Sequence, residues 1–327
     1  MAAKSSLKGV VCLVTGAGGF IGLQLCQALE SNGAIVKRLL RKHTDLKVKG
    51  CFYCELGEQK IPVDAVRDVD IVFHLAGRAH SLHEGPDEND LYSKSNVKGT
   101  LDLLVACKNQ NIKKFIYFSS VKAMGEENES CLNETSESQP VTPYGRSKLE
   151  AERLVLSGKY VPIATVLRLT MVYGVSDKGN LPKMIKAISN KRFPPYPKVL
   201  NKRSMIHVDD IIQCAKLVAL SEKSAMNTYI LNDGVEYSTR GIYEEILKCL
   251  GRKIPVWGVP IFILYIVAAT GNLIQLITGK YAPIDLERLK KLTGNSYYSS
   301  VKAVNELGFQ PKHTLYSSLQ NIVNNLI

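Results

Sequence analysis

The stretch from Val10 to Gly22, VVCLVTGAGGFIG, decides the fold. It joins an apolar run of strand length to a glycine-rich turn, and a helical pattern begins directly after the turn. Glycines in this position let backbone N–H groups approach a pyrophosphate at the helix N-terminus. Because the string follows a strand and opens a helix, it predicts a dinucleotide site. The expected cofactor contacts are Gly16, Gly18, Gly19, Phe20, Ile21 and Gly22.

The first half of the chain continues this alternation of strand and helix. Strand-like apolar runs occur at Val10–Thr15, Ala34–Leu40, Cys51–Cys54, Asp70–Leu75, Phe115–Ser119 and Ile163–Leu169. Helical patterns lie between them at Phe20–Ser31, Tyr92–Asn109 and Tyr144–Leu156. Repeated units of this kind form parallel sheets that bind ligands at the carboxyl ends of the strands. We therefore predict an α/β fold, a Rossmann-type doubly wound parallel sheet with a smaller, discontinuous α/β substrate lobe.

The second half of the chain changes character after Gly174, where prolines interrupt a basic, irregular stretch. A chain of 327 residues also exceeds the usual size of one hydrophobic core. We predict a dinucleotide-binding domain at 1–170 that is continued by 207–250. The substrate-binding lobe is expected at 171–206 and 251–327, with a cleft between the two parts.

Charge and cysteine content argue against several classes of protein. The formal net charge is +12, but Lys and Arg are scattered and no nucleic-acid motif is present, so we expect no nucleic-acid partner. The scatter fits either a basic surface or a phosphate-rich ligand. Cys51 and Cys54 form a C-x-x-C pair without a second ligand pair, so we expect no metal. The N-terminus resembles no secretory signal, and the eight cysteines are expected to be reduced thiols of a cytoplasmic protein.

One apolar segment, Val259–Ile277, approaches the length of a membrane span. Gly271, Asn272 and Gln275 dilute it, and a span at this place would split the second lobe. We therefore favour a buried or surface-docked helix. Peripheral membrane contact through 259–277 is the alternative, which would make the protein membrane-associated.

Ser120, Tyr144 and Lys148 predict the chemistry. Tyr144 and Lys148 are four residues apart at the start of a helical pattern, hence on one face of the helix. A free phenol titrates near pH 10, and a cation one turn away should lower that pKa. Tyr144 could then exchange a proton with a substrate hydroxyl while hydride passes between carbon and nicotinamide. Ser120, at the end of a strand, would hydrogen-bond the same oxygen.

Two further strand ends concern the cofactor. The fourth strand ends in Leu75, Ala76 and Gly77, whose backbone and small side chains would flank the cofactor riboses. The second strand ends without the carboxylate that usually binds the adenosine 2′-hydroxyl of NAD. Arg41 and Lys42 stand there instead and could meet a 2′-phosphate. The cofactor is therefore NADP(H) or NAD(H), and we expect NADP(H) to bind at least as well, with Arg41 as the main contact.

These residues, in this order, resemble the extended short-chain dehydrogenases/reductases of the NAD-dependent epimerase/dehydratase family, from Val11 to the C-terminus. The resemblance implies a UDP-sugar substrate and a homodimer built on the helices 92–109 and 144–156. It implies that Asn96, Tyr144 and Lys148 contact the cofactor. It also implies substrate contacts from Ser120, Thr170, Asn180, Arg203, Lys291 and Arg288.

Within the family, the segments FSSVKAMGE, KGN and NKRSMIHVDD resemble bacterial enzymes acting at C4 of UDP-N-acetylhexosamines in surface-polysaccharide biosynthesis. The leading expectation is reduction of a UDP-4-keto-(6-deoxy)-N-acetylhexosamine. The alternative is 4-epimerisation of a UDP-hexose, a UDP-N-acetylhexosamine or a polyprenyl-linked sugar. A non-catalytic NAD(P)-binding sensor is more remote, because Tyr144 and Lys148 are both intact. Val121 and Lys122 replace the Asp-Glu pair of the family's sugar dehydratases, which argues against 4,6-dehydration.

Overall fold

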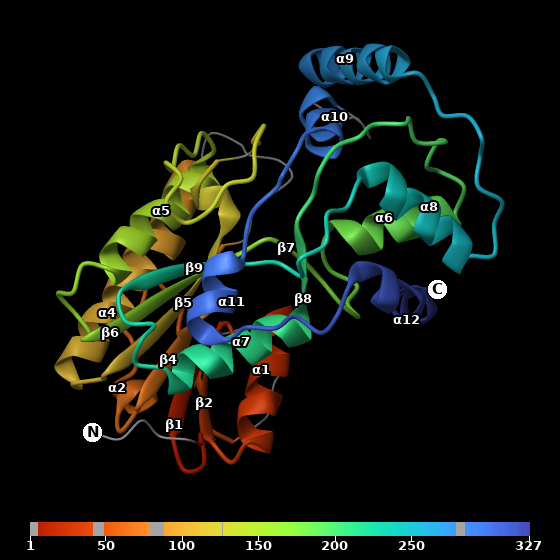
Figure 1. Ribbon diagram of the computed structural model, residues 1–327. Helices are drawn as coiled ribbons and strands as arrows, with labels where there is room; N and C mark the ends of the chain where they lie inside the picture. The colour runs from red at the N-terminus through yellow and green to blue at the C-terminus, as the bar shows by residue number, and fades with distance from the viewer. Residues whose placement is uncertain (1–5, 42–48, 79–87, 126, 279–284) are drawn as a thin grey trace.

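Seven parallel strands form the central sheet of the computed structural model, which describes residues 6–41, 49–78, 88–125, 127–278 and 285–327. Their order is β3-β2-β1-β4-β5-β6-β9. The strands are β1 (Val11–Thr15), β2 (Ile35–Leu40), β3 (Cys51–Tyr53), β4 (Ile71–His74), β5 (Lys114–Ser120), β6 (Ile163–Leu169) and β9 (Asn227–Leu231). The chain starts in the middle of the sheet and extends to both edges, which confirms the predicted doubly wound Rossmann-type fold (Figure 1).

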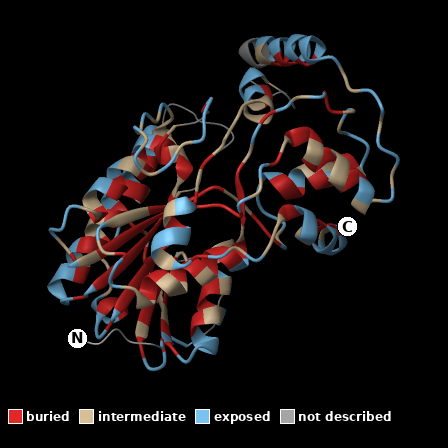
Figure 2. Cartoon of the chain, viewed as in Figure 1, coloured by how far each residue is buried: buried red, intermediate tan, exposed pale blue. Residues whose placement is uncertain are grey.

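Helices cover both faces of this sheet. One face carries α1 (Phe20–Ser31), α7 (Val208–Leu220) and α11 (Val301–Leu307), and the other carries α2 (Val63–Val66), α4 (Gly99–Asn109) and α5 (Pro143–Val155). β4 is buried along its whole length and β5 along all but its last residue, because a parallel sheet needs apolar cover on both sides. Figure 2 shows these strands as the buried centre of the larger domain.

The crevice for a ligand follows from the strand order. β2 lies on one side of β1 and β4 on the other, so the chain leaves β1 and β4 in opposite directions. Thr15, the last residue of β1, is level with Leu39 of β2 and His74 of β4. The glycine-rich turn after Thr15 therefore lies beside the segment that follows His74, at the switch point where such sheets bind ligands.

The second lobe has its own core, built on α6 (Asn180–Ser189), α8 (Thr239–Cys249) and α12 (Leu315–Leu326). Its packing changes two predicted boundaries. Residues 239–249 were expected in the sheet domain, but α8 buries Ile242 and Ile246 in the core shared with α6 and α12. Conversely, α11 falls in the range expected for the second lobe, yet its Ala303 is buried in the core of the sheet domain. A short amphipathic helix does not reveal from its own pattern which core it joins.

Two elements link the lobes, and two more extend the second lobe. β7 (Met171–Tyr173) and β8 (Met205–His207) form a separate parallel pair between the two cores. α9 (Ile261–Thr278) and α10 (Leu286–Thr293) pack on each other at the far end of the second lobe (Figure 1). Among the described residues, no helix is long and apolar enough to cross a membrane.

Candidate active site

The glycine-rich turn is fixed by how closely its backbone approaches its neighbours. Gly16 has φ +68°, and a Cβ there would lie 2.8 Å from the Ala76 amide nitrogen. A Cβ at Gly22 would overlap the Gly16 carbonyl oxygen. Both positions therefore require glycine, and the turn brings the ends of β1 and β4 together. Gly19 is the N-cap of α1 and has no side chain to occupy the first amides of that helix, so those amides suit a pyrophosphate.

A buried chain of hydrogen bonds holds the end of β4. The Ala76 amide donates to Thr15 Oγ1 (3.1 Å), which lies 2.7 Å from His74 Nδ1. His74 Nε2 lies 2.9 Å from Thr100 Oγ1, whose hydroxyl donates to the Asn96 carbonyl (2.6 Å). Because the Thr100 proton is already donated, the His74 proton belongs on Nε2, and Nδ1 accepts from Thr15. Burial lowers the pKa of His74 to about 3, so the ring is neutral.

Asn96 lies in a turn that is wider than an α-helix. The predicted helix over 92–109 is divided into α3 (Glu88–Tyr92), a π-helix (Ser93–Lys98) and α4. Such wide turns are often found at functional sites. Within it, Asn96 Nδ2 donates to Ser147 Oγ on α5 (3.0 Å), which joins the π-helix to the helix that carries Tyr144 and Lys148.

Gly77 lies where these elements converge. A Cβ at Gly77 would stand 2.8 Å from Asn96 Oδ1 and 4.0 Å from Lys148 Nζ. Three residues predicted to contact the cofactor, from three separate parts of the chain, therefore meet at the carboxyl edge of the sheet. A side chain at Gly77 would collide with Asn96, so this meeting point requires glycine.

Ser120 and Tyr144 meet where β5 ends and α5 begins. The start of α5 is fixed by Pro143 in its first turn and by Thr142, whose hydroxyl accepts from the Gly145 amide (3.1 Å). Burial raises the pKa of Tyr144 to about 12, and a hydrogen bond from the Ser120 side chain offsets part of that rise. Tyr144 is therefore a protonated phenol at neutral pH when the site holds no ligand.

Lys148 lies one turn later, and its ammonium group contacts β5. Nζ donates to the Tyr117 hydroxyl (3.0 Å) and to the Phe118 carbonyl (2.9 Å). Burial lowers the pKa of Lys148 to about 8. The expected lowering of the Tyr144 pKa by this cation is wrong for the structure, because burial raises that pKa and the ammonium group donates to Tyr117 and Phe118. Tyr117 is a residue of this site that the sequence did not indicate.

A buried ion pair anchors the same helix. Glu152, one turn beyond Lys148, accepts from Arg168 of β6 through Nη2 (2.7 Å) and Nε (3.1 Å). Ser119 of β5 also donates to this carboxylate. The negative charge of Glu152 raises the pKa of Lys148 against the larger effect of burial. The spacing of four residues from Lys148 to Glu152, which places both side chains on one face of the helix, is the only sequence signal for Glu152. No local pattern indicates its ion pair with Arg168.

The second lobe brings together some of the predicted substrate residues. Arg203 Nε donates to Thr239 Oγ1 (3.1 Å), and its Nη2 donates to the Lys291 carbonyl. The Lys291 side chain pairs with Glu287. Arg203 and Lys291 are thus neighbours, and part of the hydrogen-bonding capacity of Arg203 holds α8 and α10 together.

Three predicted substrate residues have other surroundings. The Thr170 hydroxyl is buried and donates to the Leu231 carbonyl (2.8 Å), which ties the ends of β6 and β9 together. Asn180 is exposed at the first position of α6. Arg288 lies on α10 with its Nε 3.3 Å from Asp285. The structure gives Thr170 a structural bond and leaves contacts from Asn180 and Arg288 as predictions.

A cleft of about 590 Å³ lies between the chain that follows β5 and α10. Thr142, the N-cap of α5, lines one side, and Lys290 and Lys291 line the other. Four glutamates also line the cleft, and Glu127 and Glu287 pair with these two lysines. The cleft therefore joins the beginning of the helix that carries Tyr144 to a mixed-charge surface of the second lobe.

A model of the NAD dependent epimerase/dehydratase family matches residues 12–232. The chain belongs to this family. A nicotinamide dinucleotide is therefore its cofactor, and the glycine turn and the N-terminus of α1, which has no capping side chain, fit that group.

Members of the family resemble the chain over nearly its whole length. It is 28% identical over 312 residues to a UDP-glucose 4-epimerase of Vibrio cholerae, which covers 93% of this chain and 91% of the other. It is 26% identical over 312 residues to an N-acetyl-alpha-D-glucosaminyl-diphospho-ditrans,octacis-undecaprenol 4-epimerase of Escherichia coli, covering 94% and 92%. The structure of a UDP-glucose 4-epimerase of Thermotoga maritima with UDP-glucose superposes with a TM-score of 0.77 at 22% identity, covering 97% and 98%. That superposition confirms the fold.

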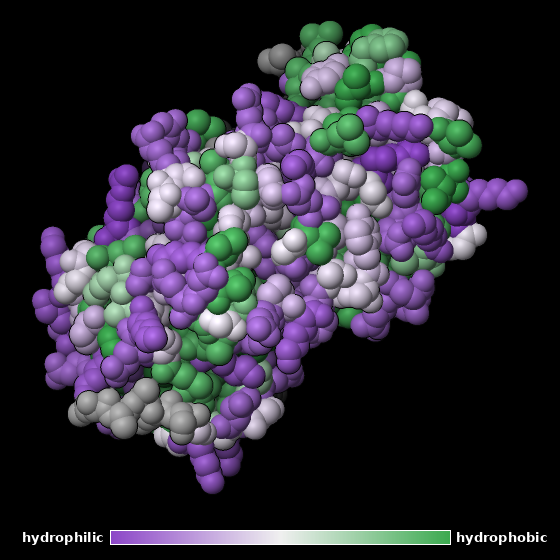
Figure 3. Space-filling model, in the orientation of Figure 1, coloured by the Kyte–Doolittle hydropathy of each residue, from purple (hydrophilic) through white to green (hydrophobic). Residues whose placement is uncertain are grey.

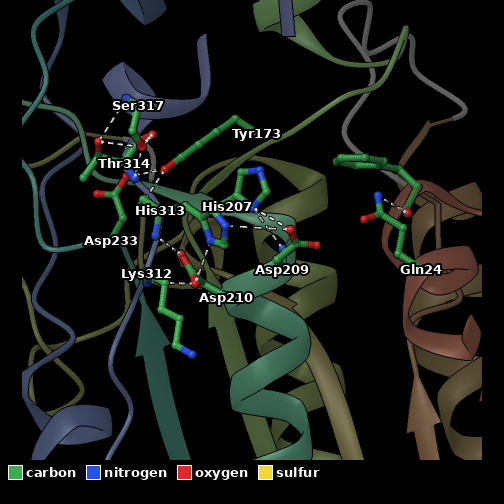
Figure 4. A network of polar contacts seen from close by, with 11 residues as sticks. Gln24, Tyr173, His207, Asp209, Asp210, Asp233, Lys312, His313, Thr314 and Ser317 are labelled. Atoms are coloured by element: carbon green, nitrogen blue, oxygen red, sulfur yellow. Dashed lines mark hydrogen bonds and ion pairs between the residues drawn. The ribbon is translucent and has the colours of Figure 1, made fainter. Parts of the chain in front are cut away.

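The lobes of this family member are locked together by a polar network beside the cofactor turn (Figure 4). Asp210 of α7 accepts from the amides of Lys312 (2.9 Å) and His313 (3.1 Å), which lead into α12. The His207 and His313 rings stack with centroids 4.3 Å apart. In the second lobe, Tyr173 donates to Asp233 (2.8 Å). Backbone capping by Asp210 thus fixes where the last segment crosses between the lobes.

Part of this network also has metal-ligating side chains. His207, Asp209 and His313 place one ligand atom each within 4.8 Å of one another. The Asp209 amide, however, donates to His207 Nδ1 (3.2 Å), and the two imidazoles are tilted by only 26°. Nearly parallel rings direct their lone pairs along similar lines instead of toward one ion. We therefore interpret the cluster as a lock between the lobes.

Arg41 follows the end of β2, where the adenosine ribose of a family cofactor would lie. Its side chain is 62% exposed, and its Nε is 4.0 Å from a carboxylate oxygen of Glu55. Lys42, the other predicted basic residue, lies outside the described residues. The guanidinium is thus available for a 2′-phosphate at the expense of a long, exposed ion pair, and its role stays a prediction.

Proposed function

We propose that the chain is a 4-epimerase that oxidises and re-reduces C4 of a sugar attached through a diphosphate, with a UDP-N-acetylhexosamine as the first candidate. The observation that carries the proposal is the meeting of Ser120, Tyr144 and Lys148 at the carboxyl edge of the sheet. The guanidinium of Arg203, which lies beside Lys291 in the second lobe, favours an anionic substrate. Two similar proteins that are named as 4-epimerases, matched over more than nine-tenths of the chain, also support it.

The roles of the side chains follow from their protonation. The bound nicotinamide supplies the hydride acceptor and donor. Tyr144 takes the proton of the 4-hydroxyl when C4 is oxidised and returns a proton to the keto oxygen when C4 is reduced, while Ser120 hydrogen-bonds that oxygen. With a pKa near 12, Tyr144 is ready for the second half-reaction. The first half requires positive charge near the phenol, and Lys148 on the same helix face is the chain's own source of it.

A second candidate is a 4-reductase, which would consume its cofactor. The observation that favours it is the basic end of β2, where Arg41 stands without the carboxylate that commonly accompanies NAD. Both reactions use the same catalytic residues, so the two candidates differ in cofactor turnover.

The test is a pair of incubations followed by NMR. In the first, UDP-N-acetylglucosamine or UDP-N-acetylgalactosamine is given to the protein with NAD in heavy water. Interconversion without deuterium at C4 is the expected result, because the hydride leaves C4 and returns to it. In the second, a UDP-4-keto-6-deoxy-N-acetylhexosamine is given with NADH or NADPH, and stoichiometric oxidation of the cofactor would identify the reductase.

Matched variants separate the active site from incidental losses. Tyr144→Phe should slow either reaction by at least about 10²-fold and still bind cofactor, whereas Tyr53→Phe, at an exposed tyrosine of β3, should change neither. Binding of UDP-sugar and NAD without any turnover in either incubation would contradict the proposal.

A further inference from the structure

α9 exposes an apolar surface that its own packing does not use. Leu264 and Ala268 are buried in a small cluster with Leu289 of α10. Phe262 and Ile266 are 62% and 60% exposed, and other large apolar side chains of the helix are at least one-third exposed. A surface helix normally turns polar residues toward water. α9 does the opposite, and Figure 3 shows apolar residues gathered over it at the top of the view.

The segment that leads into α9 enlarges this surface. Val256 and Trp257 are 88% and 63% exposed. The Val259 amide donates to the Pro195 carbonyl (3.0 Å), so this segment lies beside the 191–200 loop, whose Leu200 is 95% exposed. We call α9 together with 253–258 and 191–200 the α9 face. Its exposed apolar side chains include Trp257, and tryptophan is a side chain that favours the boundary between water and lipid.

The segments that form the α9 face carry basic and no acidic residues, while α10, which packs on α9, adds Asp285 and Glu287 beside it. The chain from Lys178 to Val208 holds eight Lys or Arg and no Asp or Glu. The chain from Ile246 to Thr278 holds three Lys or Arg and again no acidic residue. Lys191, Arg192, Lys198 and Lys253 are exposed beside the apolar side chains. A basic rim around an apolar helix is the pattern of segments that lie in the surface of anionic membranes.

We propose that the α9 face docks on a membrane surface that contains anionic lipids, with α9 lying in the plane of the interface. Anionic headgroups complement the basic rim, and the acyl boundary accepts Trp257 and the exposed side chains of α9. A second copy of this chain is a poorer occupant, because it would bring a second set of basic segments against the first. Docking in this orientation places α10 behind α9, because Leu264 and Ala268, which contact α10, lie on the side of α9 opposite Phe262 and Ile266. The proposal is independent of the reaction at C4.

The chain carries its own probe for this contact. Trp257 is its single tryptophan, so tryptophan emission, excited at a wavelength that tyrosine does not absorb, reports the α9 face alone. The experiment titrates the full-length protein with phosphatidylcholine vesicles and with vesicles that also contain phosphatidylglycerol, and measures the emission maximum and the fraction that co-sediments. With the mixed vesicles we expect the Trp257 emission maximum to shift to the blue and the protein to co-sediment. High salt should weaken this binding, because it screens the attraction between the basic residues and the anionic headgroups.

Three variants test the surface directly. Phe262→Ser combined with Ile266→Ser should weaken binding at least about tenfold, because two large apolar side chains no longer enter the interface. Lys191→Glu with Lys198→Glu should weaken binding to mixed vesicles by a similar factor, since each basic residue near an anionic surface contributes about 1 kcal/mol, or roughly fivefold. Leu91→Ser, at an exposed apolar residue of the sheet domain, is the matched control and should bind as wild type.

Two results would overturn the proposal. One is an unchanged Trp257 emission and no co-sedimentation of wild type with anionic vesicles, which needs no variant to fold. The other is light scattering that shows a wild-type dimer which the Phe262→Ser/Ile266→Ser variant converts to monomer, because a second copy would then cover the α9 face. Unchanged cofactor affinity in each variant establishes that the fold is intact.

Discussion

The carboxyl edge of the sheet and the α9 face differ in which side chains they bury and which they expose. At the sheet edge, His74, Lys148 and Glu152 are polar, buried and hydrogen-bonded to neighbours on other strands and helices. On α9, the apolar Phe262 and Ile266 are left in solvent. Buried polar groups are stable only when they are paired, and exposed apolar groups are favourable only when something covers them.

The difference separates a region whose polar groups are satisfied by neighbours within the chain from one whose apolar side chains are left exposed. The sheet edge is assembled from residues between Thr15 and Arg168, and its polar side chains are hydrogen-bonded to one another within the chain, so it is preorganised for a ligand. On the α9 face, the described residues leave Phe262 and Ile266 mostly exposed. Binding and chemistry at the sheet edge should therefore respond to loss of single polar groups, whereas the α9 face should respond to loss of apolar area.

The largest effect is expected for Tyr144→Phe at the sheet edge. Turnover should fall by roughly 10²–10⁴-fold, the usual contribution of general acid–base catalysis, while cofactor affinity and the fold stay as in wild type. Steady-state kinetics and a cofactor titration measure both quantities. Near-normal turnover would remove Tyr144 from the reaction.

The next effect concerns the buried cation. The pKa of Lys148 is about 8 in the folded chain against 10.5 for the free side chain, so between these pH values the unfolded chain binds more protons. Stability should therefore rise with pH in this window. The free energy of unfolding of wild type should gain about 3 kcal/mol relative to Lys148→Met between pH 8 and pH 10.5. Urea unfolding of both proteins across this range measures the difference, and parallel curves would contradict a charged, buried Lys148.

The sheet edge was largely predictable from the sequence because its signals are local. The glycine turn and the Tyr144–Lys148 spacing are short patterns with one physical meaning each. The contact from Lys148 to Tyr117 was not predictable, because it depends on how α5 packs on β5, thirty-one residues earlier in the chain. The π-helix at Asn96 also escaped prediction, since its sequence still follows a helical pattern.

The second lobe was less predictable, since its elements are far apart in the sequence. The amphipathic pattern of α8 fits either core, and only the packing assigns it to the lobe with α6 and α12. The apolar segment at 259–277 indicated a buried or a surface-docked helix. The structure leaves most of its large side chains exposed, which no pattern within the segment could determine.

Arg203 tests whether the second lobe binds the anionic part of the substrate. Arg203→Ala should weaken UDP binding by about 1.5–3 kcal/mol, the contribution of a hydrogen bond to a charged group, without changing cofactor affinity. Isothermal titration with UDP and with NADH separates the two sites. Because Arg203 also donates to Thr239, a Thr239→Val variant is the control for loss of that internal bond. Equal loss of both ligands in Arg203→Ala would make the residue structural.

The smallest effect is expected at Arg41, and it bears on the choice between epimerase and reductase. Arg41→Ala should weaken NADPH binding by no more than about fivefold, because an exposed ion pair is worth at most about 1 kcal/mol, and should leave NADH binding unchanged. Its nearest carboxylate, Glu55, gives the matched variant: Glu55→Gln should strengthen NADPH binding slightly by freeing the guanidinium from its pair at 4.0 Å. Fluorescence titration of both reduced cofactors against the three proteins measures these differences. If Arg41→Ala weakens and Glu55→Gln strengthens the binding of NADPH while NADH binding stays the same, the result favours the reductase, which consumes its cofactor. Tight NADH binding that neither substitution alters would refute the contact and favour the epimerase, which regenerates a held NAD.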